Sequence, residues 1–263
     1  MTVELILVPQ GAEYAAVVRS LKRQCLANIG GLETNGPLVC PIPIGANAVP
    51  YLQHLVQMGR VSQRWQGRTV LLIGLGGSLS PHYHVGDVVI PKSICWAGTS
   101  PSADGAFDDG LTTYLVRLKR YAIAPSLVNT LYQNLSCRLA QMSNSANVGI
   151  VHGITSDRIV TTPQEKRKFA EMYDAELVEM EGAYILDFFQ QRGADVGMVR
   201  VISDCCDREI PDLNNAIDPL GNLKTGRMIG QFLRQPMAAA HLIQGSLKGL
   251  RGLELIAASC VSL

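Results

Sequence analysis

The stretch that decides the fold is VEMEGA, residues 178–183, taken together with VRVISD, residues 199–204. Both place acid where an α/β protein usually carries apolar side chains, at Glu179, Glu181 and Asp204. The second stretch reads as a buried strand, and the first leads into an apolar run that is typical of a helix. Ligands of open α/β sheets bind beyond the carboxyl ends of the strands, so these carboxylates could face one pocket.

Two carboxyl groups in one cleft can divide the work, one protonated as an acid and the other ionised as an acceptor. A structural explanation is open as well. Glu179 or Glu181 can be a solvated residue in the first turn of a helix, where the dipole favours negative charge. Asp204 would then be the N-cap of the element that follows.

Composition limits the class of protein. With 263 residues, 47% hydrophobic and 17% charged, the chain can bury a sizeable core. The net charge of +1 gives no indication of a nucleic acid or an anionic membrane as partner, so we expect a small-molecule ligand. No segment reaches the roughly 18 apolar residues of a membrane span, and the first residues lack the basic region of a secretory signal. We therefore expect a cytoplasmic protein.

The seven cysteines are an odd number without CxxC spacing, which is typical of reduced, buried thiols in a cytosolic protein. Cys205 and Cys206 adjoin Asp204, but no histidine lies close to them in the sequence to complete a zinc site. His82 and His84 are a loop pair without a nearby acid or thiol. We expect no metal site.

Strand and helix patterns alternate along the chain, without internal repeats, which predicts one layered α/β domain. Pro41 and Pro43 indicate that the second strand lies at an edge or ends there, and the composition of residues 98–110 predicts a mobile loop. The expected strands are at about 4–8, 38–44, 68–73, 85–90, 149–153 and 198–202. The expected helices are at about 12–26, 45–58, 124–140, 164–173 and from 223 to the end, with a break near Pro236.

The stretch GLGGS, residues 74–78, follows the strongest predicted strand and reads as a glycine-rich turn. Such a turn lets backbone amides approach an anion or a sugar, although tight turning alone is the commoner use of glycine. Leu79 occupies the position where a dinucleotide-binding fingerprint needs its last glycine. This argues against an oxidoreductase of that kind.

Four local matches now combine: an acid after the first strand, at Glu13; GLGG at 74–77 followed by VGDVV at 85–89; VEMEG at 178–182; and RVISD at 200–204. In this order and spacing, residues 3–207 resemble the purine nucleoside phosphorylase and nucleosidase superfamily, which includes the methylthioadenosine/adenosylhomocysteine nucleosidases. The resemblance implies an α/β fold, a single-domain three-layer sandwich with a mixed central sheet flanked by helices. The domain would span residues 1–263, with 208–263 as a C-terminal helical extension.

The same resemblance implies that the enzyme splits a base from a ribose without a metal or an organic cofactor, as a homo-oligomer. Asp204 matches the acid that protonates the purine ring nitrogen, with Ser203 orienting it. Glu13 matches the acid that positions the attacking water. Glu181 would hold the ribose hydroxyls, with Met180 packed on the sugar face.

The other predicted pocket residues complete the walls. Ile159 and Val160 would cover the base, and the remainder would line the substrate: Leu75, Gly76, Gly77 and Glu179. Glycosidic cleavage passes through an oxocarbenium-like sugar, and a carboxylic acid kept protonated by partial burial neutralises the charge of the departing base. An aspartate in that role suits 6-aminopurines such as adenine.

The chain departs from the family pattern at three positions, one of which is Ile159, in the place of a base-covering aromatic residue. Leu72 stands where a phosphate-binding arginine is usual, and Leu75 where a serine is common. Phosphate, still possible as cosubstrate, would need another donor, such as Arg158 or the amides of Gly76 and Gly77. The loss of the arginine modestly favours water over phosphate as the attacking group.

The segments 203–211 and 233–236 resemble the hopanoid-associated phosphorylase branch, which removes adenine from an adenosyl-lipid precursor. An apolar pocket and an amphipathic C-terminal end would suit that substrate, while a packing helix explains the same pattern. The sequence thus predicts cleavage of a purine, adenine-type nucleoside by a phosphorylase or nucleosidase. The alternatives are a phosphorylase acting on an adenosyl-lipid and a non-catalytic nucleoside-binding domain.

Overall fold

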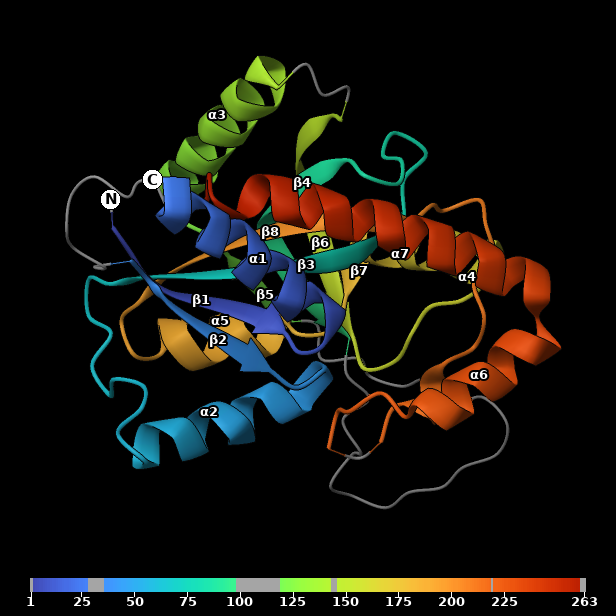
Figure 1. Ribbon diagram of the computed structural model, residues 1–263, viewed down its shortest axis with the longest axis horizontal. Helices are drawn as coiled ribbons and strands as arrows, with labels where there is room; N and C mark the ends of the chain where they lie inside the picture. Colours follow the sequence, from blue (N-terminus) through green and yellow to red (C-terminus); the bar gives the residue numbers. More distant parts are fainter. Residues whose placement is uncertain (1, 28–35, 98–118, 143–145, 219, 261–263) are drawn as a thin grey trace.

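The computed structural model describes residues 2–27, 36–97, 119–142, 146–218 and 220–260. The loop predicted at 98–110 lies outside the described residues. Eight strands in the described part form one mixed sheet with helices on both sides (Figure 1). The strands are Val3–Pro9 (β1), Leu38–Ile42 (β2), Thr69–Ser78 (β3), Val88–Ala97 (β4), Lys119–Ala122 (β5), Val148–Ser156 (β6), Leu177–Glu179 (β7) and Asp195–Asp204 (β8).

The helices form the outer layers (Figure 1). Helices α1, α3 and α7 lie on one side of the sheet, and α2 and α5 on the other. They are Ala12–Ala27 (α1), Ala48–Gln57 (α2), Pro125–Gln141 (α3), Pro163–Tyr173 (α4), Gly182–Gln190 (α5), Thr225–Arg234 (α6) and Pro236–Ala257 (α7), with short 3₁₀ turns at Gly45–Asn47 and Asn214–Ala216. The break predicted near Pro236 separates α6 from α7. The predicted fold class is confirmed.

Strand β8 organises the sheet. The strand order is β2-β1-β3-β7-β6-β4-β5, and β8 pairs parallel with β3 and antiparallel with β4. Strands β3, β7, β6, β4 and β8 therefore close a ring. Strand β2 lies at an edge, as its prolines predicted. Because residues 196–203 of β8 are all buried, the carboxyl end of this strand is fixed in the interior of the fold.

The predicted glycine-rich turn at 74–78 is wrong, because β3 continues through it as a strand. Its glycines provide space instead of a turn. A Cβ atom at Gly74 would lie 2.3 Å from Nη1 of Arg200 and 2.6 Å from Oε2 of Glu13. At Gly77 it would lie 2.8 Å from Oδ2 of Asp204. The stretch GLGGS therefore lets buried charged side chains approach the sheet.

The C-terminal helix α7 packs directly over the end of β8. A Cβ atom at Gly245 would lie 2.1 Å from the carbonyl oxygen of Ser203, and one at Gly249 would lie 2.9 Å from Cδ2 of Leu75. The helix predicted within the extension 208–263 thus lies against the same strands that carry the predicted site. Within the described residues, no helix is both long and apolar enough to cross a membrane.

Candidate active site

A cavity of about 230 Å³ lies at the carboxyl end of β8. All of the predicted site residues line it: Glu13, Leu75, Gly76, Gly77, Ile159, Val160, Glu179, Met180, Glu181, Ser203 and Asp204. Its other walls come from Pro9, Ile44, Arg158, Val178, Ile210, Pro211, Leu213 and Leu242. Segments far apart in the sequence therefore converge on one hollow, as the acid pattern predicted.

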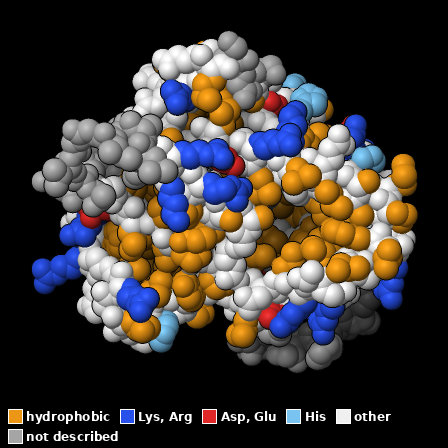
Figure 2. All heavy atoms as spheres, viewed as in Figure 1, with side chains coloured by type: hydrophobic (Ala, Val, Ile, Leu, Met, Phe, Trp, Pro, Cys, Tyr) orange, Lys and Arg blue, Asp and Glu red, His pale blue; other side chains and the backbone are white. Residues whose placement is uncertain are grey.

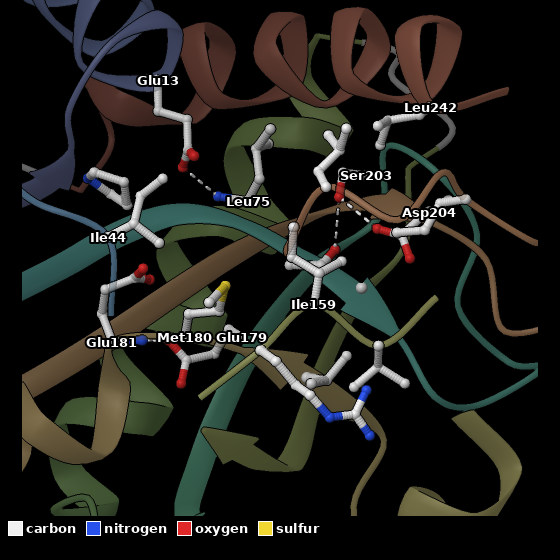
Figure 3. Close-up of a pocket in the computed structure, with 18 of the residues that line it drawn as sticks. Glu13, Ile44, Leu75, Ile159, Glu179, Met180, Glu181, Ser203, Asp204 and Leu242 are labelled. Carbon is white, nitrogen blue, oxygen red and sulfur yellow. Dashed lines mark hydrogen bonds between the residues drawn. The ribbon is translucent and has the colours of Figure 1, made fainter. Parts of the chain in front are cut away.

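The acids occupy two ends of this cavity (Figure 3). Glu13 and Glu181 lie on one side and Asp204 on the other, with Leu75 and Ile159 between them. Leu242 reaches the Asp204 side from α7. The cavity therefore has acidic side chains at both ends and apolar side chains in between.

Glu13 lies in the first turn of α1, directly after β1. Its Oε2 atom accepts a hydrogen bond of 2.7 Å from the backbone amide of Leu75. Burial raises the pKa of Glu13 to about 7, and the nearby Glu181 adds to the rise, while the charge of Arg200 and the Leu75 amide oppose it. A carboxylate with this pKa can accept a proton near neutral pH.

Arg200 is the buried cation beneath this end of the cavity. Its side chain is 0% exposed on β8, and its Nη2 atom contacts carboxylate oxygens of Glu179 and, at 3.0 Å, Glu181. Burial lowers the pKa of Arg200, but the carboxylates of Glu179, Glu181 and Glu13 outweigh that effect and raise it overall. The Nε and Nη1 atoms have no hydrogen-bond partner among the described residues. Arg200 thus pairs with two glutamates at this end of the cavity.

Glu179 ends β7, and its carboxylate is occupied by the protein. It accepts the amides of Glu181 at 3.0 Å and of Gly182 at 2.8 Å, and it also contacts the hydroxyl of Thr155. These contacts, with the ion pair to Arg200, satisfy the carboxylate on several sides. We infer that Glu179 shapes the turn into α5, whereas its predicted contact with substrate stays a prediction.

Glu181 sits at the N-cap position of α5, with its backbone outside the helix. Oε1 accepts the amide of Gly45 at 3.1 Å, and Oε2 faces Arg200. Burial raises the pKa of Glu181, the charge of Arg200 lowers it, and Glu179 adds to the rise. The carboxylate is only partly satisfied by the protein and lies at the wall of the cavity, which suits a contact with sugar hydroxyls.

Asp204 ends β8 beside two polar partners. The Ser203 hydroxyl lies 2.8 Å from Oδ1, and 3.2 Å from the carbonyl oxygen of Gly76. The ammonium of Lys166 donates to Oδ2 at 2.5 Å and to the carbonyl of Cys205 at 2.7 Å. Asp204 therefore pairs with a buried cation that the sequence interpretation did not include.

The sequence analysis missed Lys166 and did not assign Arg200 a role. Lys166 lies on α4 and is 0% exposed, although its neighbours EKRK read as a solvated helical face. No pattern in the sequence singles it out. Arg200 did leave a signal, since it is a basic residue within an otherwise apolar strand, and a charge there requires buried carboxylates as partners.

Arg158 lies at the cavity wall but is already paired with Glu165. Asp157, just before it, contacts the hydroxyl of Tyr184. Cys40, Cys95 and Cys260 are buried, while Cys205 and Cys206 are partly exposed and Cys137 is exposed. In the part of the chain that the structure describes, no group of three or more His, Cys, Asp or Glu side chains is placed to hold a metal ion.

The fold and the cavity define an α/β protein with an acid-lined pocket. The chain belongs to the phosphorylase superfamily, whose family model matches residues 9–229. The predicted superfamily is thereby confirmed, and with it the prediction of a glycosidic-bond-cleaving enzyme. No match was found among curated proteins.

Solved structures share the fold at low sequence identity. The 5'-methylthioadenosine/S-adenosyl homocysteine nucleosidase of Helicobacter pylori superposes with a TM-score of 0.62 at 16% identity, covering 100% of both chains. Futalosine hydrolase of the same organism gives 0.62 at 15%, covering 100% of this chain and 98% of its own. The 5'-methylthioadenosine/S-adenosylhomocysteine nucleosidase of Neisseria meningitidis gives 0.61 at 16%, with 100% of both chains covered.

Proposed function

We propose that this protein hydrolyses the N-glycosidic bond of an adenine-type nucleoside. The observation that carries the proposal is the single cavity with Glu13 and Glu181 at one end and Asp204 at the other. The ribose would lie between the two glutamates and Met180. The base would lie toward Asp204, between the apolar side chains of Ile159 and Leu75.

Water as the attacking group is supported by the charge around Leu75. In this cavity the Leu75 amide already binds the carboxylate of Glu13 at 2.7 Å. A phosphate placed there would face Glu13 and Glu181, and like charges at short range disfavour it. The alternative donors are also engaged, because Arg158 pairs with Glu165 and the glycines are part of a strand. Water needs none of them.

The proposed reaction follows from the positions of the acids. The bond between C1' of the ribose and the purine nitrogen breaks, and its electron pair leaves with the base. A proton passes from the ammonium of Lys166 through Asp204 to the imidazole ring of the departing purine, which leaves Lys166 as the neutral amine and Asp204 as the carboxylate. Glu13 accepts a proton from the water whose oxygen bonds to C1'. No cofactor enters this sequence of steps.

The adenosyl-lipid alternative has an observation in its favour. Four apolar residues of the C-terminal part form one wall of the cavity: Ile210, Pro211, Leu213 and Leu242. A nucleoside with an apolar substituent would find contacts there that free adenosine does not use. The cytoplasmic location and the homo-oligomer implied by the resemblance stay predictions.

The deciding experiment measures free base released from adenosine, methylthioadenosine and an adenosyl-lipid, each with and without phosphate. Hydrolysis gives the free sugar and no dependence on phosphate, whereas phosphorolysis gives a sugar 1-phosphate. We expect Asp204→Asn to lower kcat by about a hundredfold or more, because it removes a general acid. The exposed neighbour Asp207 provides the matched control, Asp207→Asn, for which we expect no change.

Two results would contradict this proposal. Rates within a few-fold of wild type in Asp204→Asn would show that another group protonates the base. Tight binding of adenine nucleosides without any release of base would instead identify a non-catalytic binding domain.

A further inference from the structure

The C-terminal part of the chain presents a large apolar surface. Helix α6 has no buried residue, although one of its faces is strongly apolar. Seven large hydrophobic side chains between residues 220 and 247 are 43–79% exposed: Leu220, Leu223, Ile229, Leu233, Met237, Ile243 and Leu247. We call these residues the C-terminal apolar surface. Figure 2 shows hydrophobic side chains gathered over α6 and the first half of α7, beside a hollow in the molecule.

The positive charge of the protein is concentrated in the same segment. Residues 222–253 contain five lysines and arginines and no Asp or Glu: Lys224, Arg227, Arg234, Lys248 and Arg251. The whole chain carries only +1, which leaves −4 for the rest. The expectation of no anionic membrane partner used the total charge, and the total conceals this local excess.

Most of these cations have no acidic partner among the described residues, although Arg227 donates to the carbonyl oxygen of Asn215 at 3.1 Å. Lys224 pairs with Asp218 at 3.1 Å. Of the described residues, no acidic side chain lies within 4.0 Å of the other four cations: Arg227, Arg234, Lys248 and Arg251. On α7, Ile243, Leu247 and Arg251 follow at intervals of four and so share one helical face. Apolar and basic groups therefore point to solvent together.

We propose that the C-terminal apolar surface docks on the surface of a lipid bilayer that contains anionic lipids. Amphipathic helices with basic side chains beside exposed leucine, isoleucine and phenylalanine lie in the membrane interface and respond to lipid charge. A second copy of this chain fits less well. A two-fold contact would set the same basic segment against itself, and like charges would repel. The proposal does not depend on which nucleoside the cavity cleaves.

The test is co-sedimentation of the full chain with vesicles of phosphatidylcholine alone, or of phosphatidylcholine mixed with phosphatidylglycerol. We expect binding to the mixed vesicles that weakens with added salt, and much weaker binding to phosphatidylcholine. Leu233→Ser combined with Met237→Ser should lower the partition constant about tenfold or more, because two large apolar side chains no longer enter the interface. Neither residue lines the cavity, so release of base from a soluble nucleoside should be unchanged.

Two further variants separate charge from apolar contact. Arg234→Glu with Lys248→Glu should weaken binding to the mixed vesicles by about tenfold or more and leave the weak binding to phosphatidylcholine unaffected. Met58, 54% exposed at the end of α2, gives the matched control Met58→Ser, with no expected change.

The proposal fails if the wild-type chain does not sediment with the mixed vesicles, or if it binds both kinds of vesicle equally well. It also fails if Leu233→Ser with Met237→Ser converts an oligomer into monomers in analytical ultracentrifugation. In that case the surface joins copies of the chain.

Discussion

Replacing Glu13 by Gln gives two measurable effects of opposite sign. The amide oxygen of Gln can still accept the Leu75 amide, so the local geometry is kept while the base is removed. We expect kcat/KM to fall about a hundredfold or more, which is typical for loss of a general base. We expect the stability of the folded protein to rise above neutral pH.

The size of the stability effect follows from the pKa. Burial raises the pKa of Glu13 from 4.5 to about 7. A difference of about 2.5 units corresponds to about 3 kcal/mol. Below pH 4.5 the carboxyl is protonated in both the folded and unfolded states, so its ionisation does not lower the free energy of unfolding of wild type. As pH rises from 4.5 to about 7, wild type loses this stability, because the carboxyl ionises in the unfolded chain while the folded chain keeps it protonated; above about pH 7 the loss is complete. Glu13→Gln should therefore gain about 3 kcal/mol relative to wild type at pH 8 and almost nothing at pH 4.

Thermal unfolding at these two pH values measures that difference. About 3 kcal/mol in a protein of this size corresponds to a rise in Tm of about 6–12 °C at pH 8. In parallel, wild-type kcat/KM should rise about tenfold per pH unit up to about pH 7 and then level off, and Glu13→Gln should lack this limb. Glu171→Gln, at an exposed site on α4, is the control for both readouts. A flat wild-type profile between pH 5 and 8 would refute the assignment of Glu13 as the base.

Three other substitutions test the buried charges and the glycines. Lys166→Met should lower the free energy of unfolding by about 3 kcal/mol and kcat at least about tenfold, because it leaves the carboxylate of Asp204 without its cationic partner. Chemical denaturation measures the first effect and initial rates the second. Unchanged values would contradict the ion pair. Gly77→Ala should lower kcat about tenfold to a hundredfold by displacing Asp204, with little change in Tm. The control is Gly226→Ala, because a Cβ atom at Gly226 meets no atom within 4 Å. Arg200→Met should destabilise the fold by about 3–5 kcal/mol. It should also raise the pH at which kcat/KM levels off, because the charge that lowers the pKa of Glu13 is gone. An unchanged pH profile would show that Arg200 does not lower the pKa of Glu13.

The sequence predicted six of the eight described strands, but not the short strands β5 and β7, and it predicted the convergence of the acids, because these depend on local pattern. Alternating strand and helix periodicity predicted the sheet and its layers, and acids at strand ends predicted a shared pocket. The use of the glycines could not be predicted in the same way. A glycine in a turn and a glycine beneath a buried charge look the same in sequence, and only the 2.3 Å and 2.8 Å approaches at Gly74 and Gly77 distinguish them.

Lys166 marks a second limit of sequence reasoning. Long-range ion pairs depend on which helix faces which strand end, and nothing local to α4 shows that one of its lysines turns inward to Asp204. The docking surface proposed for the C-terminal segment could not be predicted for a related reason. Its net charge disappears in the total for the chain, and its apolar residues fit a packing helix as well as an exposed one until their exposure is known.

The placement of charge explains why one cavity can favour bond breaking over binding alone. As a glycosidic bond dissociates, positive charge develops on the sugar and negative charge on the base. In the proposed orientation of the nucleoside, the sugar lies at the end that holds Glu13 and Glu181, and the base lies at the end that holds Asp204 with the ammonium of Lys166 behind it. A neutral nucleoside gains little from that arrangement, whereas the separated charges of the transition state are stabilised at both ends. A phosphate anion would add negative charge at the end that is already acidic, which is why the proposed reaction uses water as the attacking group.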